Sequence, residues 1–108
     1  MIAYEERAFH ALGDPTRRAV LKRLRSGGRS VGEIAKGLGV TRPAVSQHLK
    51  ILKTARLVTV HAEGTRRVYA VDVRGIESVR QWLNGFWDEA LTAFKAAAEQ
   101  EATREKKP

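Results

Sequence analysis

The sequence predicts a mainly α-helical fold with one small β-hairpin. Two short helical patterns joined by a tight turn occupy residues 30–54, and two stretches rich in β-branched residues follow at 57–71. A long helical pattern then runs over residues 75–104. At 108 residues, the chain suits one domain, with a core large enough to fold but little larger.

A short helix is predicted over residues 3–12. Ala8, Phe9 and Leu12 recur there at helical spacing, and Gly13 follows as a stop signal. The apolar positions give this helix one face that must be covered by another part of the protein.

A second helix is predicted to begin at Pro15, because Asp14 can cap it and proline suits the first helical position. Gly27 and Gly28 are expected to end it. Its apolar face consists of Ala19, Val20, Leu21 and Leu24. Its basic residues are Arg17, Arg18, Lys22, Arg23 and Arg25. We interpret most of these basic residues as a solvated face, with one or two able to reach a phosphate.

The first helix of residues 30–54 begins with a capping box. Ser30 and, three residues later, Glu33 can each satisfy a backbone amide of the first turn. Ile34 and Leu38 follow at helical spacing, and Gly39 can adopt the left-handed conformation that ends a helix.

The second helix of this pair is predicted to begin near Arg42, because Thr41 can cap it and Pro43 suits its first turn. Its core-facing side is predicted to contain Val45, Leu49 and Leu52. Its exposed side is predicted to contain Pro43, Gln47 and Lys50, flanked by Ala44, Ser46 and Lys53. A helix with hydrogen-bonding and cationic groups on one face fits the major groove of DNA.

Positive charge is concentrated in the middle of the chain. Residues 1–14 carry one base and three acids (−2), residues 15–74 fourteen and three (+11), and residues 75–108 five and six (−1). No acidic residue lies between Glu33 and Glu63. Such a field attracts nucleic acid phosphates. An anionic membrane surface fits less well, because the central block lacks the exposed apolar helix face that an interfacial helix needs.

A β-hairpin is predicted from strands at residues 57–62 and 66–71, joined by residues 63–65. Alternation places Leu57, Thr59 and His61 on one face and Val58, Val60 and Ala62 on the other. Arg66 and Arg67 lie at the tip, where cations can reach the DNA backbone or the minor groove. For Arg67, an equally good interpretation is that it only keeps the strand edge soluble.

The helical pattern from Gly75 onward is too long for so small a domain to cover. About thirty residues at about 1.5 Å each make a rod about 45 Å long. Its apolar residues are Ile76, Val79, Leu83, Phe86, Trp87, Ala90, Leu91, Phe94, Ala97 and Ala98. The same helix in a second copy would cover this stripe in a two-fold interface, to which residues 1–13 can add. The chain is polar from Thr103, and residues 105–108 are expected to fray.

Over nearly its whole length, the chain resembles the ArsR/SmtB family of winged helix-turn-helix regulators. Three segments carry this resemblance: residues 11–17 (ALGDPTR), 31–35 (VGEIA) and 43–52 (PAVSQHLKIL). The resemblance implies a homodimer that binds an operator in double-stranded DNA and represses transcription. It also implies recognition positions at Thr41, Arg42, Pro43, Ala44, Ser46, Gln47 and His48.

Different recognition residues are predicted to contact bases and phosphates. Gln47 matches adenine and Arg42 matches guanine, so these two are expected to read base edges. Phosphate contacts are expected from Thr41, Ser46, Lys50, Lys53 and Arg66. For Lys53, the alternative is a favourable interaction with the C-terminal end of its own helix dipole.

Dimerisation is predicted to involve the first and last helices. The expected interface residues are Phe9, Leu12, Val79, Leu83, Phe86, Trp87, Ala90, Leu91 and Phe94. Aromatic residues at this seam could also line a pocket for a small-molecule effector. Because aromatics at helical spacing are far more often plain core, the sequence does not support an effector.

Metal, cofactor and enzyme functions are not expected. The chain has no cysteine, whereas metal-sensing members of the family often carry a cysteine pair in the third helix. Others use aspartate and histidine on the terminal helix, but no histidine follows His61. His10, His48 and His61 lie on three separate elements without metal-ligand spacing. No nucleophile, base or carboxylate pair is arranged for catalysis.

Two alternative functions remain at this stage. The chain could be an architectural DNA-binding protein without sequence preference, or its winged helix could mainly dock another protein. The absence of cysteine, of a membrane-length apolar run and of a secretory signal pattern leads us to expect a cytoplasmic protein with no membrane partner.

Overall fold

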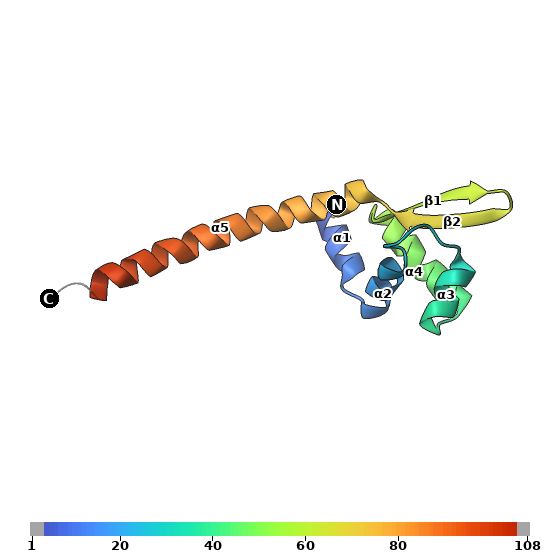
Figure 1. Cartoon of the computed structure of the whole chain (residues 1–108), viewed down its shortest axis with the longest axis horizontal. Helices are drawn as coiled ribbons and strands as arrows, with labels where there is room; N and C mark the ends of the chain where they lie inside the picture. The colour runs from blue at the N-terminus through green and yellow to red at the C-terminus, as the bar shows by residue number, and fades with distance from the viewer. Residues whose placement is uncertain (1–3, 106–108) are drawn as a thin grey trace.

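Four short helices and a hairpin form a head, and one long helix projects from it (Figure 1). The computed structural model describes residues 4–105. The elements are α1 (Tyr4–Leu12), α2 (Pro15–Arg23), α3 (Val31–Leu38), α4 (Arg42–Thr54), β1 (Val58–Glu63), β2 (Arg66–Val71) and α5 (Val73–Glu105). The molecule measures 76 × 28 × 26 Å, because α5 extends far beyond the head.

The predicted helix ends in the central pair are confirmed. Ser30 Oγ accepts a hydrogen bond from the amide of Glu33 (3.3 Å), and the Glu33 carboxylate accepts one from the Ser30 amide (3.1 Å). Gly39 ends α3 in the left-handed conformation (φ 66°). Thr41 Oγ1 then caps α4 by accepting a hydrogen bond from the Ala44 amide. Local chemistry therefore fixes both helices and the turn between them.

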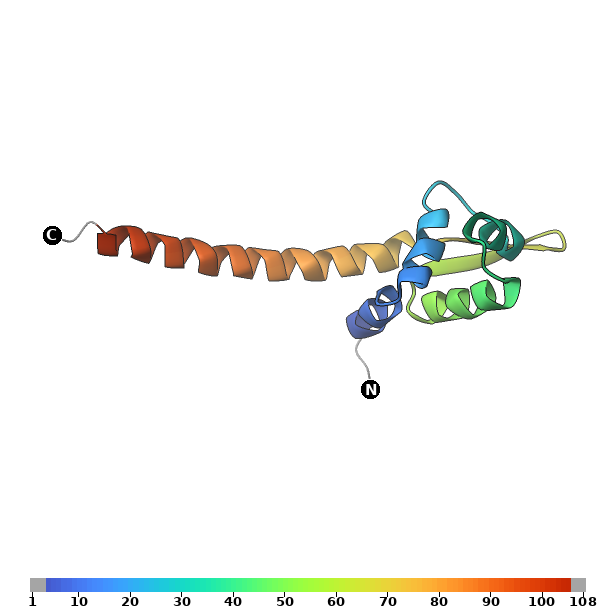
Figure 2. The same cartoon turned by 90° about the horizontal axis from the view of Figure 1, so that it is seen from below.

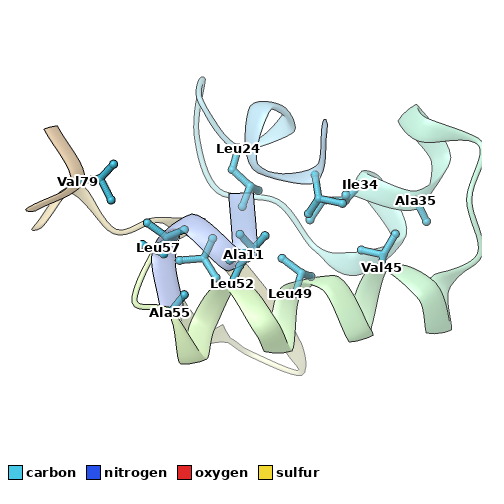
Figure 3. Close-up of a cluster of buried hydrophobic side chains, with 13 residues drawn as sticks. Ala11, Leu24, Ile34, Ala35, Val45, Leu49, Leu52, Ala55, Leu57 and Val79 are labelled. Carbon is cyan, nitrogen blue, oxygen red and sulfur yellow. The ribbon is translucent and has the colours of Figure 1, made fainter. Parts of the chain in front are cut away.

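Apolar side chains from α1, α2, α3 and α4 meet in one core, shown in Figure 3. Its largest fully buried members are Val20, Ile34, Val45, Leu49, Leu52, Leu57 and Val58. The predicted core side of α4 is thus confirmed. This core holds α4 with its opposite side facing solvent.

The prediction that Gly27 and Gly28 end the second helix was wrong. Helix α2 ends at Arg23, and a turn leads to a backbone bridge between Arg29 and Tyr69 of β2. A Cβ atom at Gly28 would lie 2.5 Å from Val68 Cγ1, so only glycine lets the chain approach the hairpin this closely.

The hairpin is antiparallel, with Glu63 paired to Arg66 across a two-residue loop. Gly64 occupies the first loop position with φ 62°, which suits a tight hairpin turn. Strand β1 lies one residue later in the chain than predicted, at residues 58–63 instead of 57–62. The connection to β2 therefore has two residues instead of the predicted three. Figure 2 shows the hairpin and α5 extending in opposite directions from the head.

The predicted placement of Leu57 on one face with Thr59 and His61 was wrong. Leu57 is fully buried, whereas Thr59 and His61 are exposed. Leu57 precedes β1 and belongs to the end of α4: its amide donates to the Leu52 carbonyl, next to Arg56 in the left-handed conformation (φ 61°). This is a Schellman ending, which turns Leu57 back into the core.

Helix α5 begins at Val73, two residues earlier than predicted, and includes Glu105, which was expected to fray. Thr103 Oγ1 donates to the Glu99 carbonyl and Arg104 pairs with Glu101, so polar side chains support its last turn. Residues 106–108 lie outside the described part. Among residues 4–105, none of the helices combines the length and apolar content needed to cross a membrane.

Candidate nucleic-acid interface

The exposed side of α4 contains most of the predicted recognition residues. Exposed positions are Thr41, Arg42, Pro43, Ser46, Gln47, Lys50 and Lys53, whereas Ala44 and His48 are partly buried. Helix α4 itself contributes no carboxylate to this surface. The helix therefore presents cations, an amide and hydroxyls on a convex surface that can enter a major groove.

Arg42 packs against the start of α3. A Cβ atom at Gly32 would lie 2.9 Å from a terminal nitrogen of the Arg42 guanidinium. The guanidinium thus rests over the backbone at Gly32, and a larger residue there would displace it. The sequence analysis did not identify Gly32, because its role depends on a side chain ten residues away.

His48 faces inward toward Asp14. Its Nδ1 lies 3.5 Å from Asp14 Oδ2, and the side chains are only 20% and 33% exposed. The two atoms are close without forming an aligned hydrogen bond. Asp14 occupies the N-cap position of α2 but makes no capping hydrogen bond, which corrects the predicted role of its side chain. Of the predicted recognition residues, His48 is thus the one held between two helices.

Arg66 does not extend freely from the hairpin. Its guanidinium pairs with the carboxylate of Glu33, which Arg29 also approaches at 4.0 Å. Glu33 thereby joins the first turn of α3 to the wing, defined here as β1, β2 and their loop. Arg67 is exposed and pairs in register with Ala62. Of the two tip arginines, Arg67 is the one without an ion pair in the part of the chain described here.

Two arginines of α2 anchor α1, although three of the five basic residues of this segment, Arg18, Lys22 and Arg25, are exposed as predicted. Arg17 is buried and donates from Nε to the Ala11 carbonyl at 2.7 Å. Arg18 donates to the Leu12 carbonyl, also at 2.7 Å. Both satisfy carbonyls that the end of α1 leaves without a helical partner. The sequence contains no signal for these two contacts, because each joins residues six positions apart across the turn between α1 and α2.

Comparisons with known proteins agree with this geometry. A family described as a helix-turn-helix domain matches residues 12–61. The chain is 52% identical over 96 residues to the HTH-type transcriptional regulator Rv2034 of Mycobacterium tuberculosis, covering 89% of this chain and 90% of that protein. It is 33% identical to the transcriptional repressor SdpR of Bacillus subtilis, covering 72% and 87%.

A solved structure shows the same arrangement. The homodimeric winged helix-turn-helix DNA-binding domain of Mb0332 from Mycobacterium bovis, described as a possible ArsR-family regulator, matches with TM-score 0.63 and 30% identity. The match covers 77% of each chain. The chain belongs to the ArsR/SmtB family of helix-turn-helix transcriptional regulators. The predicted fold class and resemblance are thereby confirmed.

In this ArsR/SmtB-family chain, the predicted dimerisation residues separate into three groups by exposure. Val79 is only 8% exposed and packs in the core of the head, so it is not available to a partner. Phe9 and Leu12 are half-buried. The exposed group on α5 consists of Leu83, Phe86, Trp87, Ala90, Leu91 and Phe94.

The aromatic residues at the base of this stripe contact one another. Phe9 of α1 meets Trp82 edge-on with ring centroids 5.0 Å apart, and Trp82 stacks on Phe86 at 5.7 Å. Trp82 therefore links α1 to the exposed stripe. No group of three or more metal-ligating side chains occurs within residues 4–105 of this family member.

Proposed function

We propose that this regulator is a homodimeric repressor that binds a palindromic operator, with residues 41–53 of each protomer in a major groove. The observation that carries the proposal is the exposed side of α4, which has no carboxylate and is held rigidly by the buried side of the same helix. A surface that only kept the domain soluble would more often mix acidic and basic residues.

The dimer rests on the exposed stripe of α5. Trp87 and Phe94 are 63% and 71% exposed in the single chain. Monomeric proteins rarely expose a continuous apolar patch with such large side chains. A second α5 would cover them in a two-fold contact. The homodimeric state of the Mb0332 domain supports this arrangement. Two α4 helices about 34 Å apart would then enter successive major grooves.

Within each groove, we assign base contacts to Gln47 and Arg42. Phosphate contacts are assigned to Thr41, Ser46, Lys50, Lys53 and Arg67. Arg66 joins this set by exchanging its Glu33 carboxylate for a phosphate when DNA approaches the wing. His48 acts through its position between α4 and Asp14 rather than by direct contact.

The test compares Gln47→Ala with Lys50→Ala. Binding to a duplex carrying an inverted repeat from the protein's own promoter region is measured by fluorescence anisotropy, beside a scrambled duplex. Gln47→Ala should reduce the preference for the repeat by about 1 to 3 kcal/mol. Lys50→Ala should weaken binding to both duplexes alike and lower the salt slope by about one.

Lys95→Ala is the matched control for charge removal, because Lys95 is exposed and lies in the second half of α5. It should leave both affinities unchanged. A wild-type preference below about a thousandfold would instead favour an architectural DNA-binding protein. No DNA binding at physiological salt would favour a wing that docks another protein.

A further inference from the structure

A cavity that is broadly open to solvent lies between α1 and the exposed side of α4. Its volume is about 630 Å³, within the roughly 300 to 1,000 Å³ typical of small-molecule sites. Its apolar part is formed by Ile51, which is half-buried, and Ala55, which is 2% exposed. The side of α1 that lines the cavity is neither the side buried in the core nor the side that contacts Trp82. The cavity is therefore separate from the proposed dimer stripe.

Two cations border this cavity, Arg7 of α1 and Lys50 of α4. The His10 imidazole and a single carboxylate, that of Glu6, lie on the same rim. Within residues 4–105, none of these four side chains forms an ion pair with another residue. Each nevertheless lies in reach of the same hollow. An apolar floor below unpaired cations suits a ligand with an apolar body and one anionic group.

We propose that this cavity binds a small organic anion, an aromatic or aliphatic carboxylate, and that the bound anion prevents DNA binding. Gln47 and Lys50 line the cavity and also belong to the proposed DNA surface, so one occupant excludes the other. The exclusion of DNA rests on the proposed function. The binding of the anion does not, because it depends only on contacts inside the cavity.

The site is tested first without DNA. Naphthalene-2-carboxylate is titrated into the full-length protein while amide shifts are followed by two-dimensional NMR. Saturable shifts should centre on Arg7, Ile51 and Thr54, and neutral 2-naphthamide should bind about tenfold more weakly. Shifts centred on Trp87 and Phe94, equal affinity for the neutral amide, or no saturation would each overturn the site.

Two charge reversals sharpen this test. Arg7→Glu should weaken binding of the carboxylate about tenfold. Arg25→Glu makes the same change in net charge outside the cavity and should leave binding unaltered. Equal losses from both variants would show a general charge effect and overturn the assignment to the cavity.

Exclusion of DNA is tested last. Naphthalene-2-carboxylate should raise the apparent Kd of wild-type protein for the inverted-repeat duplex, and should do so about tenfold less effectively with Arg7→Glu. If Arg7→Glu lowers DNA affinity and the carboxylate does not bind, the rim holds DNA phosphates and the proposal fails. If wild-type protein ignores DNA but binds the carboxylate, the proposed function fails while the anion site stands.

Discussion

The head and the outer part of α5 treat apolar side chains in opposite ways. In the head, Ile34, Leu49 and Leu52 are fully buried within one protomer. Beyond Val79, every residue of α5 through Glu105 is exposed, including Trp87 and Phe94. The head thus buries its apolar side chains within one protomer, whereas the outer part of α5 leaves an apolar stripe that only a second surface can cover.

The largest effect is expected on the α5 side of this comparison. Replacing both Phe86 and Leu91 by Asp places two carboxylates in the apolar stripe, where a two-fold contact would bring four of them together. Burial of unpaired charge is costly, so the dimer should dissociate completely in sedimentation experiments.

Thr92→Asp is the control for this prediction, because Thr92 lies about half a helical turn from the centre of the stripe. It should leave the dimer intact. A monomeric wild-type protein, or dissociation by Thr92→Asp alone, would contradict the assignment of the stripe.

A large effect is also expected in the head. Leu49→Ala removes a fully buried side chain from the core and should lower the free energy of unfolding by about 2 to 5 kcal/mol in urea titrations. Leu83→Ala removes the same atoms from a side chain that is 47% exposed. In the dissociated Asp variant it should cost less than half as much, and equal costs would show that α5 is buried within the protomer.

A smaller effect is expected at the start of α3. Ser30→Ala removes one half of the capping box and should lower the free energy of unfolding by about 1 kcal/mol. The wing should loosen as well, because Glu33 would lose the hydroxyl that orients its carboxylate toward Arg66. Hydrogen exchange at wing amides measures this loosening, and an unchanged rate would show that Arg66 alone fixes Glu33.

The smallest effect is expected on α5, at an exposed pair. Two hydrogen bonds from the Arg80 guanidinium lower the pKa of the Glu77 carboxyl. A carboxyl with a lowered pKa contributes stability above its ordinary pKa and loses that contribution as pH falls through the folded-state pKa. Carbon-detected NMR titration should show the low pKa, and Arg80→Ala should return it to the ordinary range while Tm barely changes.

Local features of the fold could be predicted from neighbouring residues, whereas contacts between distant segments could not. The Ser30 capping box, the Gly39 helix end and the buried side of α4 depend on residues within a few positions of one another. The roles of Arg17, Gly28 and Gly32 depend on partners that only the folded chain brings close. No periodic pattern in the sequence contains that information.

The candidate site divides in the same way. Exposure of Gln47 and Lys50 follows from helical periodicity alone. The inward position of His48 and the pairing of Arg66 with Glu33 do not, because each depends on a carboxylate in another element. Val79 was predicted to lie in the dimer interface but is buried in the core of the head. The apolar stripe of α5 continues into this core without a change in spacing, so periodicity does not separate the two environments.

The bridge between Arg29 and Tyr69 has a consequence for how the two DNA-facing parts respond together. Each residue donates a backbone hydrogen bond to the other, at 2.9 Å and 2.8 Å, so the wing cannot rotate relative to the start of α3 without breaking both. A movement of the start of α3 is therefore transmitted directly to the wing.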